Sequence, residues 1–273
     1  TDLAAWQKLC GLGIREWIEE KKETGAIGRI GFSFHGDTAA FLELLNAYDW
    51  DFCQIQYNYL DEHTQAGRKG LEAAAAKGIP VIIMEPLRGG RLITGLSAAA
   101  QKRVEQSGRS AAGWGLRWLW DQPGVTVVLS GMNSLGMIRD NAAQAAEARP
   151  GCMTPEEHAF VEALRDDLQG SMRVGCTGCG YCQPCPAGVD IPGVFASYNR
   201  AATEGRHAKI QYLLTTGLRR KGTGASQCVA CGKCEQHCPQ HLPIRQLLKD
   251  ASRELEGPVY KAARLGVKIL KLW

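Results

Sequence analysis

Hydrophobic and polar positions in the first 150 residues alternate between short apolar runs and longer amphipathic segments. The apolar runs predict strands, and they cover residues 28–33, 52–57, 79–84 and 125–129. The third run is apolar at nearly every position, which predicts that this strand is buried on both faces of a sheet. The repeated order of strand and helix predicts an α/β fold with parallel strands joined by right-handed crossovers.

The segments between the strands begin and end at residues that suit helix termini. We expect helices over residues 38–46, 64–77, 110–120 and about 134–148, the first capped by Asp37 and the last by Asn133 or Ser134. Residues 3–22 predict a single amphipathic helix before the first strand. Thr154-Pro155-Glu156-Glu157 is a capping box that begins a further helix to Leu168, and residues 169–175 are expected to be a linker.

Eight of the eleven cysteines lie between residues 176 and 238, in two groups of four. The groups have the spacings Cys176-x2-Cys179-x2-Cys182-x2-Cys185-Pro186 and Cys228-x2-Cys231-x2-Cys234-x3-Cys238-Pro239. Three cysteines at two-residue intervals followed by Cys-Pro are typical of [4Fe–4S] ligands, because one tight loop lets each thiolate bind a different iron. In two-cluster ferredoxins the fourth cysteine of each run binds the other cluster. Carried over to this chain, that pattern predicts one cluster on Cys176, Cys179, Cys182 and Cys238, and a second on Cys228, Cys231, Cys234 and Cys185.

Two other uses of these cysteines are weighed. Zinc sites use separated Cys-x2-Cys pairs, so the third and fourth cysteines of each group and the following prolines argue against zinc. Disulfides need an oxidising compartment, and nothing in the sequence indicates export. The 42 residues between the two groups are too many for a compact β-rich ferredoxin, and residues 191–218 have a helical pattern. We therefore expect a helical dicluster domain.

The remaining cysteines, Cys10, Cys53 and Cys152, are expected to be plain buried thiols.

The composition limits the class of protein and of partner. The chain has 273 residues, of which 45% are hydrophobic and 22% charged, as in ordinary globular proteins. A net charge of +4 is weak support for a polyanionic partner, so no nucleic acid is expected. The sequence contains no run of about 18 uncharged apolar residues, so no membrane-spanning helix is predicted. The cluster thiols and the lack of a secretory pattern in residues 1–9 indicate a reducing, cytoplasmic location.

Five motifs, in the same order along the chain, resemble those of a known family. Four of them are similar to the later strands and loops of aldo/keto reductases: Gly31-Phe-Ser-Phe-His-Gly36, Gln54-Ile-Gln-Tyr-Asn-Tyr59, Met84-Glu-Pro-Leu-Arg-Gly-Gly-Arg91 and Ser130-Gly-Met-Asn133. The fifth, Cys176-Thr-Gly-Cys-Gly-Tyr-Cys-Gln-Pro-Cys-Pro186, resembles the C-terminal extension of the iron–sulfur branch of that family.

This resemblance implies a fold and a domain organisation. The fold is α/β: the C-terminal half, strands five to eight, of a TIM (β/α)8 barrel, followed by an α-helical 4Fe-4S dicluster ferredoxin-like domain. Residues 1–150 are expected to form the half-barrel, 151–175 a helix and linker, 176–250 the dicluster domain and 251–273 a C-terminal amphipathic helix.

The resemblance also implies that no catalytic residue lies in this chain. The family's tetrad of Tyr, Asp, Lys and His comes from the first four strands, and His35, His63 and Tyr57 match other positions. We expect a C-terminal fragment, inactive alone, whose missing N-terminal half-barrel is supplied by the same or a separate chain. Two copies closing a four-plus-four barrel are an alternative. A monomeric half-barrel is disfavoured, since it exposes two sheet edges and an apolar concave face.

Positions for a nicotinamide cofactor follow from the same resemblance. Ser33 and Gln54 match residues that hydrogen-bond the carboxamide, and Met84 stands where the family has a tyrosine that stacks on the ring. The residues that match the loop along the pyrophosphate are Leu87, Arg88 and Gly89, and those of the loop after the last strand are Ser130, Gly131 and Met132. Asp140 and Asn141 match the adenine-binding pair. Met137 replaces the arginine for the 2′-phosphate, so the cofactor is NAD or NADP, with NADP disfavoured. Helix capping or loop hydrogen bonding is the other explanation for Ser33, Gln54 and Asn141.

The implied function is an aldo/keto-reductase-like oxidoreductase that reduces a small carbonyl substrate with a nicotinamide cofactor. Nicotinamide passes two electrons and each cubane accepts one, so a flavin is a possible further cofactor. Two other hypotheses also account for this mismatch in electron number: the clusters are structural or sensory, or the hydride chemistry of the barrel is degraded. The alternative function is a non-enzymatic iron–sulfur electron-transfer module with a scaffold half-barrel. In either case the redox partner is unknown.

The C-terminal segment, residues 258–273, carries Lys261, Arg264, Lys268 and Lys271 on one helical face. A basic amphipathic helix suits either a membrane surface or the protein's own surface, and docking on its own protein is favoured.

Overall fold

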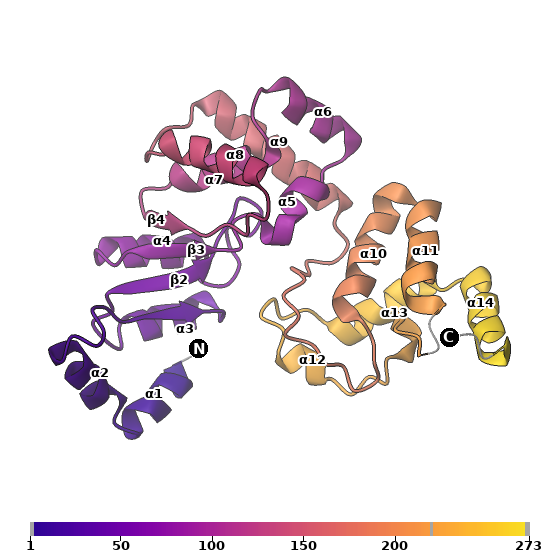
Figure 1. The fold of residues 1–273 in the computed structure, drawn as a ribbon, viewed down its shortest axis with the longest axis horizontal. Coiled ribbons are helices and arrows are strands. Elements are labelled where there is room, and N and C mark those ends of the chain that lie inside the picture. The colour runs from indigo at the N-terminus through magenta and orange to yellow at the C-terminus, as the bar shows by residue number, and fades with distance from the viewer. Residues whose placement is uncertain (1–2, 219–220, 271–273) are drawn as a thin grey trace. The chain divides into compact units, whose positions relative to one another are not determined.

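The computed structural model describes residues 3–218 and 221–270, which form two compact units, Thr1–Asp166 and Asp167–Trp273. The first unit contains a sheet of four parallel strands in the order β1-β2-β3-β4 (Figure 1). The strands are β1 (Gly31–Phe34), β2 (Phe52–Gln56), β3 (Val81–Met84) and β4 (Val125–Val128). The predicted parallel α/β sheet is confirmed, and the strand ends differ from the expected ones by at most three residues.

The two faces of this sheet differ in burial. Phe34, Ile55 and Ile83 are fully buried on the face that the helices cover. Ser33 and Met84, on the opposite face, keep access to solvent. The expectation that the third strand is buried on both faces is therefore wrong, because β3 alternates between buried and partly buried positions. A run of apolar residues reports hydrophobicity but not which layers pack on the strand.

Two helices of the first unit start at the predicted caps, Asp37 and Ser134, whose side chains each accept a hydrogen bond from the backbone of the first helical turn. Ser110, expected as the first residue of a helix, is instead the cap of that helix and accepts a hydrogen bond in the same way. The longer helices are α1 (Leu3–Gly11), α2 (Ile14–Glu23), α3 (Thr38–Leu45), α4 (Gly67–Ala76), α6 (Ala98–Gln106), α7 (Ala111–Trp120), α8 (Leu135–Ala146) and α9 (Pro155–Ser171); α5 (Arg91–Thr94) is a single turn.

The single helix predicted over residues 3–22 is wrong. It is divided into α1 and α2 at Gly13, whose φ of 82° lies in the left-handed region. A left-handed residue turns the chain out of the helical path, and glycine adopts this conformation without steric cost.

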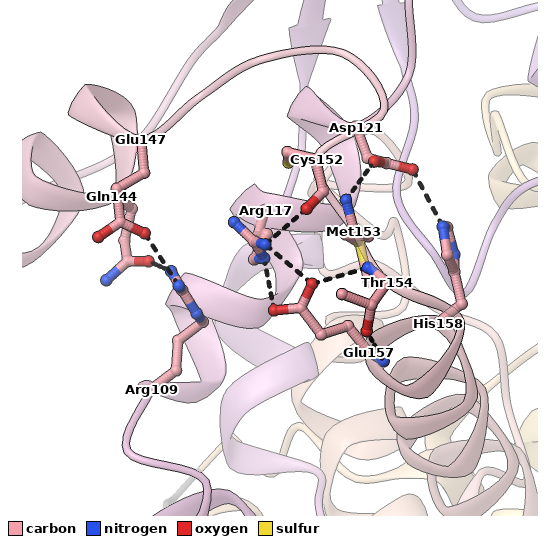
Figure 2. Close-up of polar contacts among 10 residues, drawn as sticks. All are labelled: Arg109, Arg117, Asp121, Gln144, Glu147, Cys152, Met153, Thr154, Glu157 and His158. Carbon is pink, nitrogen blue, oxygen red and sulfur yellow. Dashed lines mark hydrogen bonds and ion pairs between the residues drawn. The ribbon is translucent and has the colours of Figure 1, made fainter.

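The start of α9 is fixed by polar contacts with α7 (Figure 2). The backbone amide of Thr154 donates to Glu157 Oε2 at 3.0 Å, and the amide of Glu157 donates to Thr154 Oγ1 at 3.3 Å, so the capping box is confirmed. Glu157 also accepts two hydrogen bonds from Arg117, at 2.8 and 3.0 Å. His158 Nε2 lies 3.1 Å from the Asp121 carboxylate at the end of α7. These contacts attach α9 to the first unit.

The described residues of the second unit form helices and loops without a strand. The predicted helical character is confirmed, but the segment 191–218 is interrupted at Gly205. Residues 169–171, expected as linker, continue α9. The elements are α10 (Ile191–Glu204), α11 (Arg206–Tyr212), a π-helical turn (Leu213–Gly217), α12 (Lys233–Gln236), α13 (Ile244–Leu255) and α14 (Pro258–Leu270). Val194, Phe195 and Leu248 are among the residues of its core.

The helix α14 packs on its own unit. Tyr260 and Val267 are buried, the Tyr260 ring stacks 5.4 Å from Tyr212, and Arg264 donates to the carbonyl of Gly217 at 3.0 Å. These contacts hold one face of the described part of this helix on its own unit, while Val259, Leu265 and Ile269 are exposed. The prediction about a membrane surface stays a prediction. Lys271 lies outside the described residues, as does the side chain of Lys268. Within the described ranges, no helix has both the length and the apolar character needed to cross a membrane.

Candidate functional site

Two loops of the second unit carry the eight clustered cysteines, and their backbones repeat one another. Gly178 and Gly180 have φ angles of 78° and 81°, and the equivalent positions of the second loop, Ala230 and Gly232, have 55° and 79°. In each loop these residues lie two and four positions after the first cysteine. A left-handed conformation at both positions curls the chain so that its three cysteines face one side. Ala230 adopts it despite its Cβ atom.

The curled backbone also provides donors to sulfur. The amide of Gly178 donates to Cys176 Sγ at 3.4 Å, and the amide of Ala230 donates to Cys228 Sγ at 3.4 Å. Such N–H···S hydrogen bonds favour the thiolate, which is the form that binds iron, and they adjust the electronic properties of a cluster.

The cysteines line two cavities. One is lined by Cys176, Cys179, Cys182 and Cys238, together with mostly apolar residues and the polar Thr177 and Gln240. The other, of about 160 Å³, is lined by Cys182, Cys185, Cys228, Cys231 and Cys234. The fourth cysteine of each run therefore lies beside the other group, in the crosswise pattern expected from the spacing. The assignment of ligands to clusters stays a prediction.

Electrostatics within the cavities follows the same grouping. Burial raises the pKa of the Cys182 thiol to about 12, and repulsion from Cys176, Cys179 and Cys238 adds to the shift. Burial also raises the pKa of Cys234, with smaller contributions from neighbours that include Cys228 and Cys185. Bound iron would offset this repulsion, because several thiolates in one cavity need nearby positive charge.

Thr177 supplies a further group suited to a cluster. It is 6% exposed, lines the first cavity, and its Oγ1 has no hydrogen-bond partner among the described residues. A buried hydroxyl without a partner is unfavourable, and the sulfur of a cluster would accept its hydrogen bond. No group of three or more His, Cys, Asp or Glu side chains in the described ranges could hold a single metal ion. The donor set, the curled loops and this hydroxyl fit a [4Fe–4S] cluster.

In the first unit, the predicted nicotinamide-binding residues lie together on the partly exposed face of the sheet. Ser33 pairs with Gln54 in the register of β1 and β2, and Met84 lies on the neighbouring strand β3. Gln54 Nε2 lies 3.4 Å from Met84 Sδ, and Ser33 Oγ lies 4.0 Å from the same sulfur. The structure thus brings a hydroxyl, an amide and a thioether to one patch. Neither Ser33 nor Gln54 caps a helix.

The loop after β3 has a strained backbone. Glu85 and Arg88 have φ angles of 51° and 52°, which are unfavourable for residues with a Cβ atom, and Gly89 follows at 62°. The Arg88 side chain is buried, with Nε 3.0 Å from Asp61 Oδ2. For the predicted pyrophosphate contact, this loop therefore has its backbone available rather than a free guanidinium. Leu87, beside it, packs against Gly115 of α7.

Sequence reasoning missed Glu85 as a residue of this loop. Burial raises the pKa of its carboxyl group, the negative charge of Asp61 adds to the rise, and Oε2 has no hydrogen-bond partner among the described residues. Its position directly after an apolar strand was the available signal.

The remaining predicted cofactor residues make contacts within the protein. Asn141 Nδ2 donates to Ser130 Oγ at 2.9 Å, and Asp140 accepts from Ser110 Oγ at 2.7 Å. A hydrogen bond within the loop region therefore explains the presence of Asn141 just as well as the predicted adenine binding does. Gly131 and Met132 are exposed on the loop after β4.

Tyr57 and the three cysteines outside the two cysteine-rich loops are not expected to be site residues. Tyr57 is fully buried, and its ring lies 5.2 Å from that of Trp118. Burial raises the pKa of the Tyr57 hydroxyl to about 12. Cys53 is fully buried as predicted, and burial raises its pKa to about 12. Cys10 and Cys152 are only partly buried, so the prediction of fully buried thiols is wrong for them.

Comparison with known proteins supplies the family. A model of the aldo/keto reductase family matches residues 13–150, and a model of a 4Fe-4S dicluster domain matches residues 175–242. No curated protein matches the chain. Among solved structures, a protein described as a 2,5-diketo-D-gluconic acid reductase B is 26% identical; the match covers 54% of this chain and 48% of that one, with a TM-score of 0.41. A thermostable aldo-keto reductase in complex with epalrestat is 20% identical, with 54% and 52% covered and the same TM-score of 0.41. This chain spans about half the length of those two proteins. The chain belongs to the aldo/keto reductase family and carries a 4Fe-4S dicluster domain after its reductase segment.

Proposed function

We propose that this chain is the cofactor-binding and iron–sulfur part of an oxidoreductase that reduces a small carbonyl compound with NAD or NADP. The observation that carries the proposal is the convergence of Ser33, Gln54 and Met84 on one face of the sheet. These three residues come from three strands, and only the pairing of the strands brings them together.

Each of the three has a separate task at the nicotinamide ring. The Ser33 hydroxyl and the Gln54 amide would hydrogen-bond the carboxamide and so fix which face of the ring meets the substrate. Met84 would pack on the ring with its polarisable sulfur, a less directional contact than that of a stacked aromatic side chain. When bound, the cofactor supplies a hydride to the carbonyl carbon. The proton for the carbonyl oxygen comes from an acid in the catalytic tetrad, outside this chain.

We propose that residues 1–150 are strands five to eight of a (β/α)8 barrel and that a further four strands complete it. In support, the edge strand β4 and the helix after it are poorly covered: Val127 and Leu129 are exposed, and α8 has no buried residue. An uncovered edge with exposed aliphatic side chains is suited to pairing with another strand. The domain limits 151–175, 176–250 and 251–273 belong to the same proposal.

Nicotinamide binding by the completed barrel tests this function. The chain is joined to, or co-expressed with, its N-terminal half, and the Kd for NADH and NADPH is measured by protein fluorescence. Gln54→Ala is expected to raise the Kd about fivefold to tenfold, since one hydrogen bond contributes roughly 1 kcal/mol. Gln169→Ala, the same change at an exposed position of α9, is the control and leaves the Kd unchanged. Equal Kd values for both variants would refute the assigned face.

A second candidate is an electron-transfer module with a scaffold half-barrel. It is favoured by one observation: all eight cluster cysteines lie in this chain, whereas none of its residues matches the family's tetrad. Iron analysis does not separate the two candidates, but turnover of NADH with a carbonyl substrate by the completed barrel does. Absorption and fluorescence spectra of the same preparation establish whether a flavin connects hydride and one-electron chemistry.

A further inference from the structure

The two cysteine-lined cavities differ in charge. The cavity lined by Cys185, Cys228, Cys231 and Cys234, here called the basic cavity, has Lys233, His237 and Arg245 in its lining and no acidic residue. The other cavity is lined by no charged side chain. This difference arises although the two loops have the same backbone form.

The cations of the basic cavity are not equivalent. Arg245 is held by Glu235, with Nη2 2.7 Å and Nε 2.9 Å from the same carboxylate oxygen. Lys233 is exposed and has no ion pair among the described residues. The positive charge of Lys233 is therefore available at the surface for a partner molecule.

Exposed apolar side chains lie beside these cations. Tyr181 and Val229, which also line the basic cavity, are 53% and 69% exposed, and Cys231 is exposed as well. A small apolar patch with charged residues around it is typical of weak, transient protein contacts, and an exposed ligand shortens the path for an electron.

The charge of the whole second unit has the same sign. Residues 167–273 contain 15 Lys and Arg against 7 Asp and Glu, a net +8, whereas residues 1–166 contain 17 against 21, a net −4. The net charge of +4 for the whole chain is thus the sum of a strongly basic second unit and an acidic first unit. Such a field attracts and orients an acidic partner.

We propose that the rim of the basic cavity, formed by Tyr181, Val229, Lys233 and Arg245, is the docking site of an acidic one-electron carrier protein. The inference rests on the proposed function, in that it requires clusters held by the predicted cysteines. In the transfer, the reduced carrier loses one electron and the cluster ligated at this cavity gains it. No bond forms or breaks, and no proton moves.

The test uses the full chain with both clusters reconstituted and an acidic [2Fe–2S] ferredoxin as the carrier. Reduced ferredoxin is mixed with the oxidised protein, and the rate of electron transfer is followed by stopped-flow absorption and freeze-quench EPR. Lys233→Glu is expected to slow the reaction at least about tenfold at low salt, and the difference should vanish at about 0.5 M NaCl. Lys261→Glu makes the same change of charge on α14 and is expected to slow it by less than about threefold.

Two controls separate the possible failures. Reduced methyl viologen, a small cation, should reduce both variants at least as fast as it reduces the wild type. This result would show that the clusters of the variants are intact. Iron and sulfide contents near zero in the wild type would refute the proposed function itself. Intact clusters with equal effects of Lys233→Glu and Lys261→Glu would refute the docking site alone.

Discussion

Ala230 is the non-glycine member of the four left-handed positions in the cysteine loops, and its replacement by glycine is expected to stabilise the second unit. A left-handed conformation costs an alanine about 1–2 kcal/mol, because Cβ approaches the following carbonyl oxygen. Glycine removes this cost but loses about 0.5–1 kcal/mol through the greater freedom of the unfolded chain. The net gain is about 0.5–1 kcal/mol.

The matched change is Gly232→Ala in the same loop. A Cβ atom there would approach the Arg245 side chain no closer than 3.7 Å, an ordinary contact, so its cost is conformational rather than steric. Taking the same two contributions with opposite sign, this variant should lose about 0.5–1 kcal/mol.

Urea unfolding followed by circular dichroism at 222 nm measures both changes, with cluster absorption recorded in parallel under anaerobic conditions. With an m-value of roughly 2 kcal/mol/M, Ala230→Gly should raise the midpoint by about 0.3–0.5 M, and Gly232→Ala should lower it by a similar amount. An unchanged or lower midpoint for Ala230→Gly would show that the backbone at residue 230 is not left-handed, and the repeat between the loops would then be lost.

Two further predictions concern single hydrogen-bonding groups. Thr177→Val, which keeps the shape and removes the buried hydroxyl, should lower the reduction potential of one cluster in an EPR-monitored titration, whereas Thr177→Ser should restore it; identical titrations for all three proteins would contradict the hydrogen bond to sulfur. The ion pair with Arg117 holds the pKa of Glu157 below its usual range. The Glu157 carboxylate therefore stabilises the fold fully above its unfolded-state pKa of about 4.3. This stabilisation is lost as the pH falls through the lower pKa of the folded state. Arg117→Ala should therefore destabilise the chain at pH 7 more than at pH 3 in thermal unfolding, and a pH-independent difference would refute the linkage.

The sequence predicted best what depends on neighbours in the chain. The capping box at Thr154 and Glu157 needs only four consecutive residues, and its reciprocal hydrogen bonds form as expected. The strands followed from apolar runs bounded by turn residues. The break at Gly13 was missed, because a glycine inside an amphipathic pattern is compatible with a continuous helix until tertiary packing selects the left-handed conformation.

Thr177 and Val229 show where local reasoning stops. They occupy the same position in two loops of similar backbone. Thr177 is buried and its hydroxyl has no hydrogen-bond partner in the part of the chain that the structure describes, whereas Val229 is exposed. The difference depends on which residues from distant segments cover each loop, so spacing alone does not reveal it.

The same distinction explains why the two candidate sites differ in how far the sequence determined them. The cluster cysteines lie within ten residues of one another in the first run and eleven in the second, so loop geometry alone brings most of each set together. Ser33, Gln54 and Met84 span three strands, and a shift of one residue in the register of β2 or β3 would turn Gln54 or Met84 to the helix-covered face. The spacing of residues in the sequence does not determine that register. The resemblance to a family identified the three residues, and the strand pairing in the structure shows that they lie close together. A substitution that shifts the register is therefore expected to abolish the proposed nicotinamide binding without removing the proposed clusters, because the cysteine loops belong to the other compact unit.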